Sequence, residues 1–145
     1  VTAAKMHSIL LSAHDLFLPL NPILNFAVGE DFSTKKASLL PALTKKIENI
    51  EHALASTNSP FFVDNKPRAC DFLAYHHLDL SRTLYQNIFL KFPRITELLK
   101  AIESIDSVRN YLETRPKLID IGVSPKLIIN GTAHPTGTKN TANFI

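Results

Sequence analysis

The chain has 145 residues, of which 45% are hydrophobic and 20% are charged. This is enough for one domain with a hydrophobic core, and it excludes a disordered chain. No apolar run approaches the roughly 20 residues that cross a bilayer, so we expect no membrane span. Lys and Arg exceed Asp and Glu by 16 to 13. This mild excess lacks the concentrated basic stripe of nucleic-acid-binding proteins, so a main role in nucleic-acid binding is not expected.

Cysteine usage and the first residues indicate the compartment and the extent of the chain. The single cysteine, Cys70, cannot form an internal disulfide, and nothing resembles a signal peptide. We therefore expect a reducing compartment, the cytoplasm. A start at Val1 rather than Met, within a helical pattern, is consistent with a piece of a longer protein.

The first segment has the spacing of a helix. One stripe at intervals of four and three residues contains His7, Leu11, His14 and Leu18. Pro19 and Pro22 are expected to kink or end this helix, because proline lacks a backbone donor and crowds the preceding turn. Residues 29–33 are expected to form a connection.

The next helix has the clearest pattern of the chain. Its apolar positions recur at spacings of three and four, which places them on one face: Leu40, Leu43, Ile47, Ile50 and Leu54. Pro41 near its start is expected to bend or end the preceding turn. Residues 56–60 are expected to close the helix, and residues 64–67 are expected to form a turn.

Three further helices are predicted before residue 116. The first runs from about Arg68 to Tyr85, and its apolar beginning predicts the most buried element. The second opens at Phe92–Pro93, and its inward positions are Ile95, Leu98, Leu99 and Ile102. The last is short, with Asp106 as the expected cap, and its apolar positions are Val108, Tyr111 and Leu112.

The periodicity fails after Pro116. Residues 126–129 favour a short strand, and Asn130–Gly131 favours a tight hairpin turn. A two-stranded piece alone is only marginally stable. We therefore predict an all-α fold of about five helices over residues 1–116, followed by an irregular tail over residues 117–145 that forms at most a short hairpin.

Four segments, in the same order, resemble the C-terminal helical domain of cytosolic glutathione transferases, with the mu and sigma classes closest. The resemblance covers roughly residues 3–116. The segments are Leu40–Pro41 with Leu43 and Ile47, then Phe61–Phe62–Val63–Asp64–Asn65, then Asp71–Phe72–Leu73–Ala74–Tyr75, and finally Phe92–Pro93 with Ile102, Ile105, Val108, Tyr111 and Arg115.

The resemblance implies a cytoplasmic, dimeric, detoxifying enzyme that joins glutathione to a hydrophobic electrophile. In this family the residue that activates the glutathione sulfur, and most groups that bind the tripeptide, belong to an N-terminal thioredoxin-like domain. This chain contains no such stretch, so we expect it to carry no catalytic residue and to need that domain as a partner. Glutathione is implied as a co-substrate, and no cofactor is expected.

The resemblance also implies which residues line the site for the electrophile. The candidates are His14, Phe17 and Leu18, near the end of the first helix, although ordinary packing against a neighbouring helix explains them equally well. Leu11 falls where the family often has a carboxylate that reaches the glutathione amine across the dimer. Leucine cannot balance an ammonium group, so that contact is not carried over.

Asp71 is predicted to be a structural cap rather than a catalytic group. In the family the buried helix begins with Ser or Thr, and an acidic residue three positions later completes a capping box. Here Arg68 replaces the Ser or Thr. We expect the remaining half of the box, in which the Asp71 carboxylate accepts from the Arg68 backbone N–H near the positive end of the helix.

No metal site is expected. His76 and His77 are adjacent on a predicted helix and diverge by about 100°, while His7 and His14 lie about 10 Å apart. Neither pair suits a tetrahedral centre. Cys70, on the inner helix with only Arg68 as a nearby cation, is expected to be an inert core thiol.

A second function stays open at this stage. The same helical fold occurs in non-catalytic assembly modules of translation-related complexes, and fold alone does not decide between them. In either case the faces that meet a partner are expected to be apolar and exposed. We therefore expect the isolated chain to self-associate, or to cover those faces with its tail around Leu127–Ile129.

Overall fold

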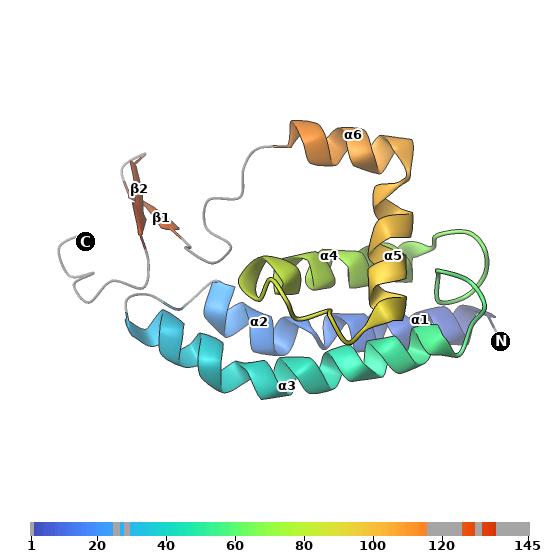
Figure 1. Ribbon diagram of the computed structural model, residues 1–145, viewed down its shortest axis with the longest axis horizontal. Coiled ribbons are helices and arrows are strands. Elements are labelled where there is room, and N and C mark those ends of the chain that lie inside the picture. The colour runs from blue at the N-terminus through green and yellow to red at the C-terminus, as the bar shows by residue number, and fades with distance from the viewer. Residues whose placement is uncertain (1, 25–26, 28–29, 116–125, 130–131, 136–145) are drawn as a thin grey trace.

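The computed structural model describes residues 2–24, 27, 30–115, 126–129 and 132–135. The prediction of an all-α fold is confirmed: the core is formed by a helical bundle and by a few residues of the loops that join its helices (Figure 1). Within the described residues its helices are α1 (Thr2–His14), α2 (Phe17–Leu24), α3 (Glu30–Ala55), α4 (Ala69–Leu84), α5 (Pro93–Glu103) and α6 (Asp106–Thr114).

The first predicted helix is divided into α1 and α2, and the break comes before the prolines rather than at them. A proline ring clashes with the carbonyl four residues earlier, which for Pro19 belongs to Asp15. α1 therefore ends at His14, and α2 begins at Phe17. Pro19 falls in the first turn of α2, where backbone N–H groups have no helical partner in any case.

The connection expected at residues 29–33 is wrong from residue 30 onward, because α3 already begins at Glu30. An i,i+4 ion pair between Asp31 and Lys35 supports this first part of the helix. α3 also continues through Pro41, which is exposed, so its missing hydrogen bond lies on the solvent side. The helix is bowed in Figure 1, as expected for a helix with an internal proline.

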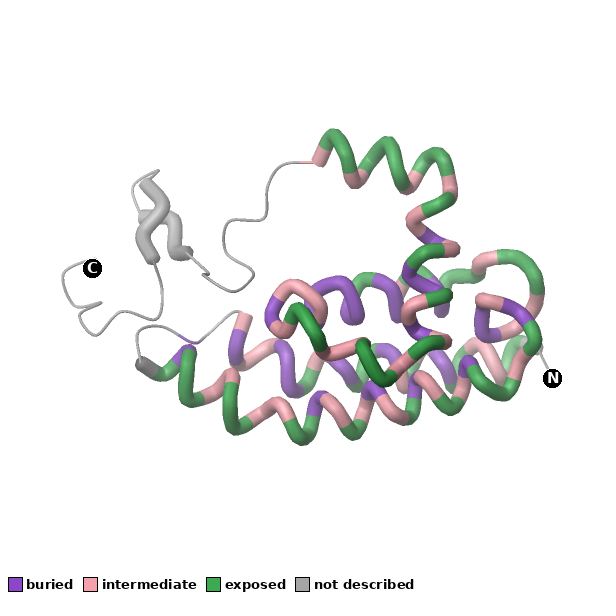
Figure 2. The backbone as a smooth tube through the Cα atoms, viewed as in Figure 1, coloured by how far each residue is buried: buried purple, intermediate pink, exposed green. Residues whose placement is uncertain are grey.

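α4 is the central element, as predicted. Arg68 is its N-cap and Tyr85 its C-cap, and it packs against α1, α2 and α5. The apolar stripe predicted for α3 also faces the core: Leu43, Ile47, Ile50 and Leu54 are fully buried. Figure 2 shows the buried positions concentrated where α1 to α5 face one another.

α5 begins at Pro93, and its four predicted inward residues are all buried. Glu51 of α3 fixes its start, because the two carboxylate oxygens accept from the backbone N–H groups of Arg94 and Ile95 at 3.1 and 2.9 Å. The prediction that Asp106 caps α6 is wrong. Ile105 is the N-cap, and Asp106 is the first helical residue, where it pairs with Arg109 one turn later.

Strands β1 (Lys126–Ile129) and β2 (Thr132–Pro135) pair antiparallel, with Ile129 opposite Thr132. The turn expected at Asn130–Gly131 lies outside the described residues, as does most of the predicted tail over 117–145. No helix within the described ranges has the length and apolar character that crossing a membrane requires.

Candidate functional site

The three residues predicted to line a substrate site lie at the break between α1 and α2. His14 is the last residue of α1, and Phe17 is the first of α2. The break brings their rings together in a stack, with centroids 5.8 Å apart and planes inclined by 20°. Leu18 follows, and 61% of its surface is exposed. The structure therefore brings His14 and Phe17 together and leaves Leu18 facing outward beside them.

His77 of α4 lies behind this stacked pair. Its ring centroid is 6.3 Å from that of His14 and 5.9 Å from that of Phe17, and only 5% of its surface is exposed. Neither ring nitrogen has a hydrogen-bond partner among the described residues. Burial lowers the pKa of His77 to about 4, and the neighbouring His76 and His14 add to this effect. His77 is therefore a neutral imidazole at pH 7.

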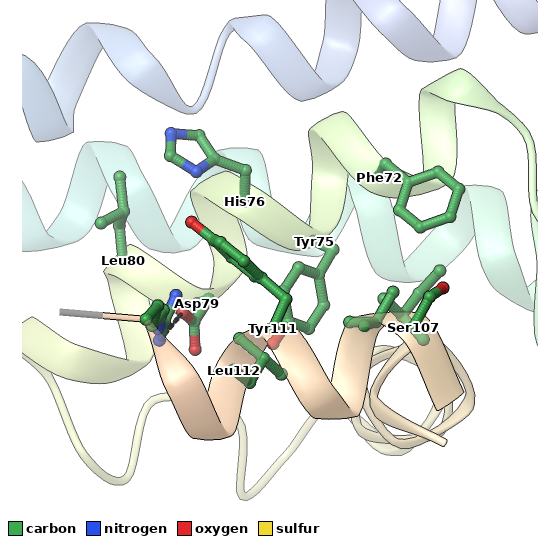
Figure 3. A pocket seen from close by; sticks show the side chains of 11 residues that line it. Phe72, Tyr75, His76, Asp79, Leu80, Ser107, Tyr111 and Leu112 are labelled. Carbon is green, nitrogen blue, oxygen red and sulfur yellow. Dashed lines mark hydrogen bonds and ion pairs between the residues drawn. The ribbon is translucent and has the colours of Figure 1, made fainter. Parts of the chain in front are cut away.

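A pocket of about 510 Å³ opens on the adjacent surface, between α4, α5 and α6. Figure 3 shows Phe72, Tyr75 and His76 of α4 on one side, and Tyr111 and Leu112 of α6 on the other. His76 joins the pocket to the stacked pair, because its ring also lies 5.0 Å from that of His77. The pocket and the stacked pair are therefore linked through the buried ring of His77.

The charged groups at the edge of the pocket are already paired. Arg115 of α6 and Arg82 of α4 both reach Asp79, at 3.4 and 2.6 Å. Arg82 also pairs with Glu103 of α5 at 2.8 Å. Tyr75 donates to the same Glu103 carboxylate. Burial, followed by the charges of Asp79 and Glu103, raises the pKa of the Tyr75 hydroxyl to about 12. This network joins three helices, and its own charged groups are all paired.

Asp71 lies at the start of α4, away from this surface. Its carboxylate accepts from the backbone N–H of Arg68 at 2.7 Å, which is the bond expected from the sequence, and from the backbone N–H of Phe62 at 2.9 Å. Cys70 beside it is fully buried. Burial raises the pKa of its thiol to about 11, and the charge of Asp71 acts in the same direction. The thiol therefore stays protonated at neutral pH.

Two other points raised by the sequence concern the exposure of Leu11 and the possibility of a metal site. Leu11, one turn before His14, is 56% exposed, so it presents an apolar side chain to solvent. Among the described residues, no group of three or more His, Cys, Asp or Glu side chains is placed to hold a metal ion. His76 and His77 instead take part in ring contacts.

Sequence reasoning missed the contact between His77 and the stacked pair, and the pocket formed by Phe72 and Tyr111. A signal for His77 was present. It falls on the same helical stripe as four other residues that are all buried: Cys70, Ala74, Leu78 and Ser81. The pocket had no comparable signal, because it depends on how α6 folds back over α4.

The comparisons with known proteins agree with this architecture. The family model for the C-terminal domain of glutathione S-transferases matches residues 14–115. Glutathione S-transferase B of Cavia porcellus is 30% identical over 84 residues, which are 58% of this chain and 38% of that protein. Probable glutathione S-transferase 6 of Caenorhabditis elegans is 27% identical over 118 residues, 79% of this chain and 57% of that protein.

A mu-class protein is also among the relatives. Human glutathione S-transferase Mu 4 is 27% identical over 94 residues, which are 65% of this chain and 42% of that protein. The chain thus spans between 38% and 57% of the length of these three relatives.

Solved structures show the same fold. The structure of NaGST-2 superposes with a TM-score of 0.69 at 20% identity, over 79% of this chain and 57% of that one. The glutathione S-transferase Blo t 8 gives 0.66 at 25% identity, over 76% and 51%. With the family model covering most of the helical bundle, the chain belongs to the family of glutathione S-transferase C-terminal domains.

Proposed function

We propose that this chain is the helical half of a cytoplasmic, detoxifying glutathione transferase. In this role it supplies one wall of the site where a hydrophobic electrophile meets glutathione, and part of the surface of a homodimer. Glutathione is a co-substrate held mainly by a thioredoxin-like domain, and no cofactor is required. The chain spans only part of its relatives, so these are properties of a larger assembly.

One observation carries the proposal: large apolar and aromatic side chains lie exposed on the surface around the stacked pair and the pocket. We call this surface the exposed face and define it by six residues: Leu11, His14, Leu18, Phe72, His76 and Tyr111. Leu11, Leu18, Phe72 and Tyr111 are 56%, 61%, 41% and 61% exposed. Exposed apolar side chains gathered together mark a surface that binds a partner or a ligand. The exposed face includes two of the three wall candidates.

The chemistry of these residues separates two roles, contact with the electrophile and contact with the thioredoxin-like domain. The stacked His14–Phe17 pair and Leu18 offer apolar and aromatic contact to an electrophile, whereas the pocket between α4 and α6 suits an apolar side chain of the thioredoxin-like domain. The carboxylate and guanidinium groups beside the pocket are engaged in the network of Asp79, Arg82 and Arg115. Activation of the glutathione sulfur is therefore assigned to the partner domain.

The experiment uses the protein as it is expressed from its own gene, with any sequence upstream of Val1 included. We expect retention on immobilised glutathione and turnover of a generic hydrophobic electrophile. Leu18→Ala is expected to raise the KM for the electrophile by about threefold or more, because it removes apolar contact, and to leave the KM for glutathione unchanged. Leu90→Ala is the matched control, since Leu90 is an exposed leucine that lies outside the exposed face.

The alternative is a non-catalytic assembly module, and Leu11 is the observation that favours it. An exposed leucine replaces the carboxylate that would contact the glutathione amine, and such a side chain suits protein docking. Failure of the expressed protein to bind glutathione or to turn over the electrophile would overturn the enzyme proposal and leave this alternative.

A further inference from the structure

The imidazole of His77 carries hydrogen-bonding capacity that the described residues leave unused. A neutral imidazole has one N–H donor and one bare nitrogen acceptor. Both nitrogens of His77 are buried without a partner among the described residues, although 95% of its surface is enclosed. Buried polar groups in proteins nearly always have a partner, so such an exception calls for an explanation.

Two of the three rings that lie against His77 belong to the proposed wall. His14 and Phe17 lie against its ring on the α1–α2 side, and His76 lies against it on α4. His14 is exposed and ends α1, and its ring makes only stacking and edge contacts within the described chain. Exposed side chains change rotamer within nanoseconds, and access of a ligand to His77 requires the exposed His14 ring to turn aside.

The charges nearby indicate that this ligand is neutral. The acidic groups closest in sequence are paired elsewhere, Asp15 with Lys46 of α3 and Asp79 with Arg82 and Arg115. Among the described residues, the groups whose charge acts on His77 are His76 and His14, and neither is a Lys or an Arg. An anion would therefore find no cation to pair with, and the three rings are not placed to hold a metal ion.

We propose that His77 is a specificity-determining residue of the wall. Its imidazole forms a hydrogen bond with an oxygen of a flat, neutral aromatic ligand that lies against His14 and Phe17. The stacked pair recognises the aromatic ring, and the enclosed imidazole recognises the polar substituent. Because the imidazole is removed from water, an aromatic ligand without that oxygen leaves His77 unpaired and binds more weakly. The inference rests on the proposed function only where it concerns the reaction of the ligand with glutathione. Binding of the ligand at His77 does not depend on that function.

The test measures binding to the 145-residue chain in the absence of glutathione. Acetophenone and ethylbenzene are the probes, because they share one shape and differ by a carbonyl in place of a methylene. Binding is followed by NMR through the ring signals of His14, Phe17 and His77, at equal free concentrations of the two probes. We expect acetophenone to bind about threefold to tenfold more tightly, which corresponds to one net hydrogen bond, and to shift the imidazole signals of His77.

Two substitutions at His77 separate the hydrogen bond from the packing. His77→Phe keeps a ring but removes both nitrogens, so the preference for acetophenone is expected to vanish while ethylbenzene still binds. His77→Gln restores a donor and an acceptor and should recover part of the preference. His52→Phe at the exposed end of α3 is the control, and it should leave both affinities unchanged.

Equal affinity of the two probes for the unsubstituted chain would overturn the inference, and so would the absence of any binding at the wall. A preference that survives in a folded His77→Phe variant would also overturn it. If His77→Phe does not fold, the comparison of the two probes on the unsubstituted chain still decides. The proposed enzyme function fails separately, through loss of glutathione retention and turnover in the expressed protein.

Discussion

At the residue scale, His77 is the least expected side chain in the core. It occupies a position in α4 that the helical spacing assigns to the interior. Its two ring nitrogens nevertheless form no hydrogen bond with the described residues. The rings in contact with it are the phenyl ring of Phe17 and the imidazoles of His14 and His76. The fold therefore tolerates this histidine only in its neutral form, because protonation would create a charge without a partner.

This arrangement predicts a pH dependence of stability. The pKa of His77 falls from 6.5 to about 4 on folding, so the unfolded chain binds more protons than the folded chain between these values. The free energy of unfolding should then decrease as the pH falls from about 6.5 to about 4, by up to about 1.4 kcal/mol per pH unit. Urea unfolding of the unsubstituted chain and of His77→Phe, across this pH range, measures the contribution.

The His77→Phe variant should lose this part of the slope and become the more stable protein at pH 5, since a phenyl ring has no polar atoms to desolvate. His52→Phe provides the comparison at an exposed site and should retain the slope. Parallel pH profiles for the unsubstituted chain and His77→Phe would contradict the assignment of a neutral, buried imidazole.

At the element scale, Asp71 connects α4 to the loop that precedes it. One carboxylate oxygen accepts from the N-cap residue Arg68, and the other accepts from Phe62. Phe62 is among the largest fully buried side chains. The capping interaction therefore also fixes how a core aromatic residue enters the bundle, which a capping box within one helix does not do.

Replacement of Asp71 by alanine is expected to lower the free energy of unfolding by about 2 kcal/mol, because the buried backbone N–H of Phe62 and the partly buried N–H of Arg68 lose their acceptor. Chemical denaturation measures this change. Asp106→Ala is the matched control, since Asp106 also lies in the first turn of a helix but is exposed, and it should change stability by less than about 0.5 kcal/mol. Equal effects of the two substitutions would contradict the role assigned to Asp71.

The helices that the sequence located best are those whose apolar stripe faces the core over several turns. Leu43, Ile47 and Ile50 in α3 are fully buried at the predicted spacing, and Ile95 and Leu98 in α5 behave likewise. Element ends were less predictable, because they depend on single backbone clashes and caps. The clash at Pro19 acts on the turn before it, and Ile105 rather than Asp106 precedes the first turn of α6.

The candidate site could be predicted only in part. His14 and Phe17 are only three residues apart, so the sequence places them near each other, but the stacking of their rings depends on the break between α1 and α2. The contact of both rings with His77 joins segments about 60 positions apart, and no local pattern reports such a pairing. The pocket between Phe72 and Tyr111 likewise depends on the turn between α5 and α6.

At the scale of the whole molecule, the described residues form a well-packed core but leave large apolar side chains exposed on the surface. α6 has no fully buried residue (Figure 2) and is joined to the bundle through the ion pair of Arg115 with Asp79 and through partly buried Val108 and Leu112. The exposed face lies beside it. The side chains of residues 127–129, which the sequence suggested as a cover, lie outside the described part of the chain.

The central claim is that a partner covers the exposed face in the full protein. Sedimentation velocity of the 145-residue chain tests this claim most directly. Without a partner domain the chain should self-associate as its concentration rises, and so should Leu90→Lys, which alters an exposed leucine elsewhere. The double substitution Leu11→Lys with Leu18→Lys should give a monomer, because it places two charges on the face. A chain that stays monomeric even after residues 117–145 are removed, or association that the double substitution leaves unchanged, would contradict the account.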